Sequence, residues 1–214
     1  MDDKIQQWYV HLIDVYGISK ATFLLAEKLY DDYDDKSNMR EMQIVLINAL
    51  FHSAAVNIGR ILDNDENGIN VHKFLATYCT EEKTKITFMV DLAAVERLRK
   101  RRNKILVHAD KGLLSQDVYE RFPLYISDLK SILKSLEDLL LPLGKKITGN
   151  SVAGINQKTG EWDFEPTRQV ETQYTIFKDM LAKCRRIERY MGEKYPYEFL
   201  RICYDKGENE NGQT

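Results

Sequence analysis

Cysteine is scarce in this chain, whose 214 residues include three, Cys79, Cys184 and Cys203. They lie far apart, no two form a CxxC pair, and none has a histidine at a metal-ligand spacing. This pattern argues against a disulfide framework and against a zinc site. We therefore expect a protein of a reducing compartment. We also expect neither a bound metal nor a cofactor.

The sequence also lacks a recognisable targeting signal. Its first residues, MDDKIQQWYVHLIDVYG, are acidic and carry neither the basic region nor the apolar run of a signal peptide. We expect no segment that is long enough to span a bilayer. The expectation is a cytoplasmic protein without a membrane partner.

A large net charge of either sign is absent as well. Lysine and arginine number 31 and aspartate and glutamate 33, so the formal net charge is −2. This balance argues against a protein that coats nucleic acid nonspecifically, so any contact with RNA would need a local basic patch. Hydrophobic residues at 43% and charged residues at 30% are typical of a folded globular chain.

Helical periodicity dominates the first two thirds of the chain, where alternation with a period of two is almost absent. The pattern predicts five or six helices, at about residues 4–32, 38–62, 70–78, 80–108, 115–141 and 167–193. Thr80 opens TEEK, which resembles a capping box and is expected to start the fourth helix. Pro142 and Gly144 are expected to end the fifth.

The stretch TGNSVAGINQKTGEWDFEP differs in kind, because it is rich in Gly, Asn and Thr. Within it KTGEW separates two short apolar pieces, which predicts a small β-hairpin near residues 151–165. The predicted fold class is therefore all-α, a bundle of five to six helices with this hairpin. We expect a helical domain at 1–145 and a C-terminal extension at 146–214 that packs on the same domain.

The candidate functional residues lie in LRKRRNKILVHADKG, residues 98–112. Arg102 falls four residues after Leu98 and three before Ile105, so it interrupts the apolar stripe of the helix. Six steps along an ideal helix set Arg102 and His108 about 120° apart. Packing of this helix against its copy about a two-fold axis would bring both side chains of both subunits into one cleft. We therefore expect a homodimer with the motif at its interface.

These residue types suit cleavage of RNA without a metal. The imidazole of His108 titrates near neutral pH and can move the proton of a 2′-hydroxyl or of the leaving 5′-oxygen. The guanidinium of Arg102 can hold the phosphate as charge builds on it. Asn103 could orient the substrate or the imidazole, and Asp110 could set the tautomer of His108. Local positive charge would come from Arg97, Arg99, Lys100, Arg101 and Lys104.

Each of these features also has a structural interpretation. An arginine beside an apolar stripe commonly snorkels or pairs with a carboxylate such as Asp63. A histidine at the end of a helix, as His108 would be, commonly interacts with the helix dipole. A basic run is commonly a solvated helix face. The spacing alone therefore leaves both interpretations open.

At RRNKILVHAD the sequence resembles the HEPN superfamily (higher eukaryotes and prokaryotes nucleotide-binding). The signature of that superfamily is an arginine, usually followed by a polar residue, and a histidine after a short spacer. Arg102, Asn103 and His108 match it with five intervening residues. ALFHSAAVNIGRILDND, a short helix and RNKILVHAD together resemble its U-type abortive-infection branch. The resemblance covers about residues 1–145.

The resemblance implies a HEPN-like helical bundle that forms a homodimer. It implies a metal-independent endoribonuclease of toxin or phage-defence type, cleaving RNA to 2′,3′-cyclic phosphate and 5′-hydroxyl ends. Such an enzyme would act in antiviral defence or abortive infection, with a nucleotidyltransferase-type antitoxin as a partner in a toxin–antitoxin pair. The alternative is a non-catalytic HEPN-like dimer that binds RNA, a nucleotide or a protein.

By motif position, the resemblance implies roles for individual side chains. Arg102 would bind the phosphate, His108 would act as the acid/base group, and Asn103 would support them. Arg101 is a rival for the arginine role, because it precedes His108 by seven residues and shares a helix face with it. Together with Arg101, the supporting residues of the predicted site are Lys104 and Asp110.

Overall fold

The computed structural model of the chain describes residues 2–33, 40–65, 68–103, 121–149, 153–155, 162–164, 170–179 and 182. Five labelled helices are α1 (Asp3–Asp31), α2 (Arg40–Leu62), α3 (Val71–Glu81), α4 (Leu92–Arg101) and α6 (Ile126–Thr148), and residues 170–179 are helical too. Strands β1 (Ala153–Ile155) and β2 (Trp162–Phe164) pair antiparallel. The predicted all-α bundle and its small hairpin are thus confirmed.

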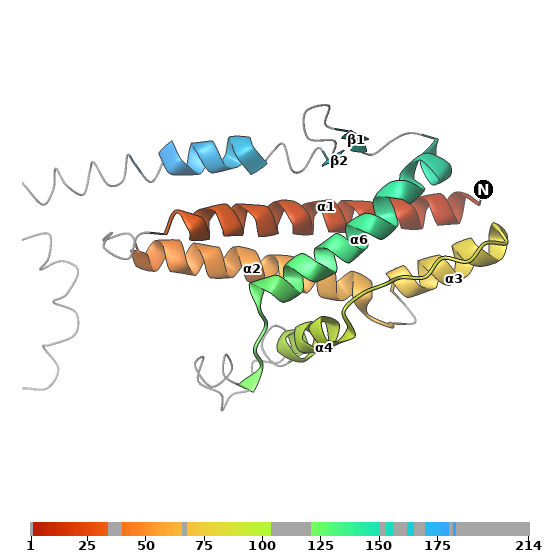
Figure 1. Cartoon of the computed structure of the whole chain (residues 1–214), viewed down its shortest axis with the longest axis horizontal. Helices are drawn as coiled ribbons and strands as arrows, with labels where there is room; N and C mark the ends of the chain where they lie inside the picture. The colour runs from red at the N-terminus through yellow and green to blue at the C-terminus, as the bar shows by residue number, and fades with distance from the viewer. Residues whose placement is uncertain are drawn as a thin grey trace, which may run out of the picture.

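Helices α1 and α2 lie side by side along the long axis of the molecule, and α6 crosses α1 (Figure 1). The short helix α4 packs against both α2 and α6, and α3 packs against α1. Asp2 caps the start of α1, and its carboxylate accepts a hydrogen bond from the backbone N–H of Lys4 at 3.0 Å. This arrangement brings α4, the carrier of the candidate motif, to the ends of two longer helices.

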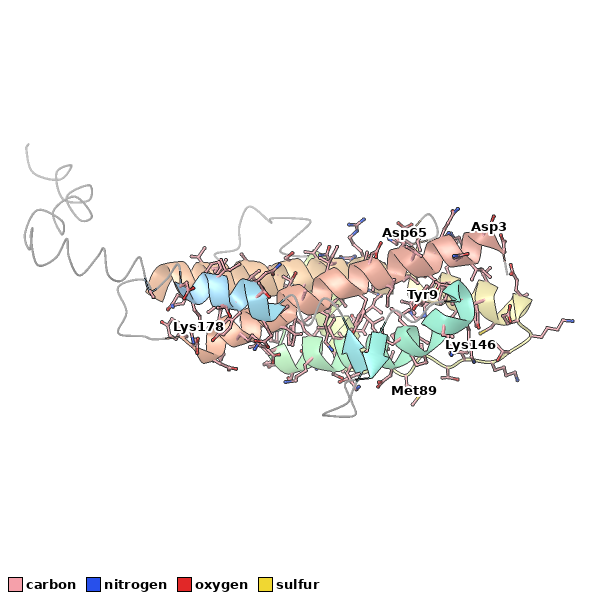
Figure 2. The ribbon with its side chains drawn as sticks, turned by 90° about the horizontal axis from the view of Figure 1, so that it is seen from above. Asp3, Tyr9, Asp65, Met89, Lys146 and Lys178 are labelled. Atoms are coloured by element: carbon pink, nitrogen blue, oxygen red, sulfur yellow. The ribbon has the colours of Figure 1, made fainter. Side chains whose placement is uncertain are left out.

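Two buried tyrosine hydroxyl groups of α1 and the partly buried carboxylate of Glu137 connect α1 to α6. The hydroxyl of Tyr9, which points into the interior in Figure 2, donates to the carbonyl of Leu140 at 3.0 Å. The hydroxyl of Tyr16 donates to Oε2 of Glu137 at 2.7 Å, and Lys20 forms an ion pair with the same carboxylate. The fully buried apolar side chains around them include Ile5, Leu12, Phe23, Ile58, Ile61, Phe74, Leu98, Ile132 and Leu136.

The predicted fourth helix at 80–108 is wrong in its first half. Thr80 belongs to α3, where its hydroxyl donates to the carbonyl of Ala76 at 2.8 Å instead of capping a new helix. Residues 84–91 are not helical, and α4 begins only after Asp91. The carboxylate of Asp91 accepts from the backbone N–H groups of Ala93 and Ala94 at 2.9 and 3.2 Å. The N-cap of α4 is therefore Asp91 and not a residue of TEEK.

Side-chain exposure alternates along the segment 85–90. β-Branched residues are frequent in it, and they favour an extended backbone over a helix. The exposed side of the segment includes Met89, which is 77% exposed (Figure 2). The half-buried side chains are Ile86, Phe88 and Val90, and the exposed ones are Lys85, Thr87 and Met89.

The predicted fifth helix at 115–141 differs from α6 at both ends. Residues 122–125 are not helical, and α6 starts at Ile126, so Pro123 precedes a new helix start. At the other end α6 continues through Pro142, although proline lacks the N–H of a helical hydrogen bond. Burial of Leu143 and Ile147 in the core outweighs that loss. The helix ends at Gly149, whose φ of 74° is the left-handed conformation that glycine adopts readily.

Helix α6 crosses residue 145, and the division into 1–145 and 146–214 stays a prediction. Contrary to expectation, one described helix is long and apolar enough to cross a membrane, Gln43–Leu62 with a mean hydropathy of 1.5. A single such helix is weak evidence, because core helices of soluble proteins pass the same test. The cytoplasmic location stays a prediction.

Candidate functional site

Arg101, Arg102 and Asn103 lie at the C-terminal end of α4, where this helix packs against α2. Helix α4 ends at Arg101, and the backbone N–H of the next residue, Arg102, donates to the carbonyl groups of Leu98 and Arg99. Neighbouring side chains on a helix point about 100° apart. Arg101 and Arg102 accordingly line two different grooves, one on each side of the end of α4.

The guanidinium of Arg102 is held by two neighbouring side chains. Its Nη1 forms an ion pair with Oδ2 of Asp63, at the end of α2. Its Nε and Nη2 donate to Oδ1 of Asn103 at 3.3 and 3.0 Å. The side chain is 14% exposed. The structure thus contains the ion pair with Asp63 that the structural interpretation of Arg102 predicts. Asn103 holds the same guanidinium through two hydrogen bonds.

A glycine on α2 makes room for this arginine. A Cβ atom at Gly59 would lie 3.0 Å from Cδ and 3.3 Å from Nη1 of Arg102, which is closer than ordinary van der Waals contact. The side chain of Arg102 therefore packs directly on the α2 backbone. A groove of about 330 Å³ opens beside it, and its lining includes Asp63, His72, Glu96, Arg99 and Arg102.

Arg101 is buried on the other side of α4, with 4% of its surface exposed. Its Nη1 donates to the backbone carbonyl of Phe122 at 3.0 Å. His52 of α2 is half-buried nearby, and burial, followed by the positive charge of Arg101, lowers the pKa of His52 below its ordinary 6.5. Both side chains line a second groove of about 180 Å³ between α1, α2, α4 and α6.

The basic cluster of α4 divides into structural and exposed members. Arg97 binds Asp128 of α6 through two hydrogen bonds of 2.9 and 2.6 Å, and these bonds lower the pKa of the Asp128 carboxyl. Arg99 and Lys100 are each 61% exposed, with Glu96 as a neighbour at 4.0 and 3.6 Å. With Arg101 buried, Arg99 and Lys100 are the described members that present positive charge to solvent.

Three residues of the predicted site, Lys104, His108 and Asp110, lie outside the described residues. The placement of His108 beside Arg102, and the homodimer that would join two copies of the motif, stay predictions. Within the described ranges, no three or more His, Cys, Asp or Glu side chains gather where they could hold a metal ion. The described part of the predicted site therefore consists of Arg101, Arg102 and Asn103.

Sequence reasoning did not single out His52 or Tyr125, which line the second groove. His52 stands in the apolar run ALFHSAAV, where a lone histidine is commonly part of the core. A polar residue inside an apolar helix was the available signal. Its proximity to Arg101 arises from the packing of α4 on α2, which the sequence pattern did not reveal.

Comparison with known proteins identified no relative of this chain. No protein-family model, no curated protein and no solved structure matches the chain. The resemblance to the HEPN superfamily therefore depends on residues 98–112 and on the helical context, and it stays a prediction.

Proposed function

We propose that this protein is a metal-independent endoribonuclease of the HEPN type that acts as a toxin or in phage defence. The observation that supports the proposal is an arginine held in a fixed position at the edge of a groove. Asp63 and Asn103 hold Arg102 over Gly59, and the groove beside it is about 330 Å³ in volume. A positive group that is oriented in advance is what stabilises the charge of a phosphoryl transition state.

In the proposed reaction His108 accepts the proton of the ribose 2′-hydroxyl. The 2′-oxygen then attacks the adjacent phosphorus, and the bond from phosphorus to the 5′-oxygen breaks. The leaving 5′-oxygen takes up a proton, from His108 or from its copy in the second subunit. The products are a 2′,3′-cyclic phosphate and a 5′-hydroxyl end, and neither a metal nor a redox cofactor takes part.

Arg102 would neutralise the non-bridging phosphate oxygens, with Asn103 fixing the plane of its guanidinium. Asp110 would orient the ring of His108. The exposed charges of Arg99 and Lys100, extended by Lys104, would attract the RNA backbone. Cleavage should consequently weaken as salt is raised.

The direct test is incubation of the purified full-length protein with RNA in the presence of EDTA. The wild type should cut the RNA to 2′,3′-cyclic phosphate ends, and His108→Ala should reduce the rate about 10²- to 10⁴-fold. Arg102→Ala should reduce it about 10²- to 10³-fold. Arg60→Ala serves as the matched control, because Arg60 is exposed in the last turn of α2 and has no role in the proposed site.

Intact RNA after incubation with folded, dimeric wild type would overturn the proposal. Equal cleavage by the wild type and His108→Ala would overturn it as well, because the activity would then come from another residue or from a contaminant. Light scattering of the same samples reports whether the protein is the expected homodimer. Co-expression with a nucleotidyltransferase-type antitoxin should relieve any toxicity of the wild type.

A non-catalytic, HEPN-like binding module is the second candidate. The ion pair between Arg102 and Asp63 favours it, because this pair already compensates the guanidinium charge within the fold. In that case His108→Ala would leave RNA binding and cellular phenotype unchanged. Reversal of the exposed charges at Arg99 and Lys100 would abolish them. Loss of phenotype with His108→Ala at unchanged stability would count against this candidate.

A further inference from the structure

The second groove, on the Arg101 side of α4, has mixed apolar and polar walls. It lies between the end of α1, the middle of α2, the end of α4 and the start of α6, and its volume is about 180 Å³. Small-molecule sites usually measure about 300–1,000 Å³. A groove of this size therefore suits one ring of a larger ligand better than a whole ligand. Its aromatic members are Tyr30, Phe51 and Tyr125, and its polar members are Asn48, His52 and Arg101.

Two tyrosines at this groove are exposed to solvent. Tyr30 is 57% exposed and Tyr125 is 56% exposed, although both carry large rings. The guanidinium carbon of Arg97 lies 5.8 Å from the ring centre of Tyr125, which is within the range of a cation–π contact. Exposed aromatic rings are the surfaces on which proteins stack the unpaired bases of single-stranded RNA.

The polar members of the groove can recognise the edge of a base. Arg101 is buried, with 4% of its surface exposed, and its Nη1 already donates to the carbonyl of Phe122, so it contributes positive charge to the lining of the groove. Because burial and Arg101 lower the pKa of His52, the neutral imidazole is favoured, which has one donor and one acceptor nitrogen. Asn48 adds an amide with both donor and acceptor atoms. A base edge presents the same alternation of donors and acceptors.

The position of the groove relates it to the proposed site. Arg101 directly precedes Arg102, so the groove with the tyrosines and the groove beside Arg102 flank the same end of α4. A strand that passes over this end could place its phosphate at Arg102 and an adjacent base in the second groove.

We propose that the groove lined by Tyr30, Tyr125 and Arg101 receives one unpaired base of single-stranded RNA and so sets the nucleotide preference of cleavage. The role in cleavage depends on the proposed function, whereas the binding of the base can be tested without it. A duplex should not enter, because its bases are stacked and paired.

The test measures binding of short labelled RNAs to the full-length protein carrying His108→Ala, which keeps the RNA intact. In this background, Tyr30→Ala with Tyr125→Ala should weaken binding of single-stranded RNA by roughly 5- to 150-fold, the effect of losing one stacked base. Tyr30→Phe with Tyr125→Phe keeps both rings and should bind like the parent. Met89→Ala removes an exposed large side chain outside this groove and should also leave binding unchanged.

Equal binding by the alanine pair and the phenylalanine pair would overturn the base site, as would no binding by the parent. Double-stranded RNA bound with the same dependence on the tyrosines would also overturn it. If the tyrosines matter for binding but the wild type does not cut RNA, the base site stands and the proposed endoribonuclease fails. If the wild type cuts, sequencing of the ends should show that the alanine pair loses the nucleotide preference of the parent.

Discussion

Arg102 and Asp63 form an ion pair that joins the end of α4 to the end of α2. The side chains are 14% and 28% exposed, so the pair is partly shielded from solvent. Asn103 holds the same guanidinium from a second direction. The pair is therefore both a structural link and the feature that fixes the orientation of the candidate phosphate-binding group.

Asp63→Ala should lower the free energy of unfolding by about 1–3 kcal/mol, because it leaves a partly buried guanidinium without its carboxylate. If Asp63 orients Arg102 for cleavage, the same variant should also reduce the rate of RNA cleavage. Urea unfolding and cleavage in EDTA measure the two effects. Asp63→Asn keeps the shape of the side chain and should fall between the wild type and Asp63→Ala. Unchanged stability in Asp63→Ala would contradict the importance of the pair.

Gly59→Ala should separate stability from function. Alanine is favoured over glycine in a helix by about 1 kcal/mol, which offsets the close contact of the new Cβ with Arg102. We therefore expect stability within about 1 kcal/mol of the wild type. The displaced guanidinium should reduce the rate of RNA cleavage about 10- to 100-fold. Ser53→Ala, at an exposed position of α2, is the control. Full activity of a folded Gly59→Ala protein would argue against a role for Arg102.

Asp128→Ala should destabilise the junction between α4 and α6 by about 1–3 kcal/mol. Its carboxylate accepts hydrogen bonds from Arg97 and from the backbone N–H of Tyr125 at 3.0 Å, so both partners lose their acceptor. The pKa of Asp128 is lowered in the folded protein. Its contribution to stability is therefore present above the ordinary value of 3.8 and is lost as pH falls through the lower folded value. Thermal unfolding of wild type and variant at neutral and acid pH measures both statements.

His52 should make stability depend on pH in the mildly acid range. Burial and the charge of Arg101 lower its pKa, so the unfolded chain takes up a proton at a higher pH than the folded one. This contribution is present above the ordinary value of 6.5 and is lost as pH falls below it. His52→Gln cannot titrate, so the wild type should lose stability relative to this variant between about pH 7.5 and 5.5. Parallel curves for the two proteins in urea unfolding would contradict the burial of His52.

Long elements with one clear period were predictable from the sequence. The helical spacing of apolar residues at 4–32 and 38–62 placed α1 and the end of α2 within a residue or so. The hairpin followed from glycine and asparagine between two apolar pieces, and the structure pairs Ala153 with Phe164 at that place. In these cases the signal is local, so neighbouring residues carry all the information.

The errors occurred where tertiary packing overrides a local signal. TEEK has the composition of a capping box, but the half-buried side chains that follow it are spaced by two residues, as in an extended segment. Pro142 is a helix breaker in isolation, yet the buried Leu143 and Ile147 keep α6 helical. The strength of such packing cannot be judged from the chain alone.

Part of the candidate site could also be predicted from the sequence. The sequence named Asp63 as a carboxylate that could pair with Arg102, and this pair is present. It did not distinguish Arg101 from Arg102 by environment, although one is buried against Phe122 and the other packs over Gly59. That difference depends on how α4 is rotated against α2 and α6.

The alternation at residues 85–90 makes this segment intolerant of odd changes in length. Inserting one residue after Thr84 would shift the register by one, so that the inward positions would receive Lys85, Thr87 and Met89 in place of their apolar neighbours. Inserting two residues would return apolar side chains to the inward positions. A one-residue insertion should therefore impair folding more than a two-residue insertion, which is the opposite of what loop length alone would suggest.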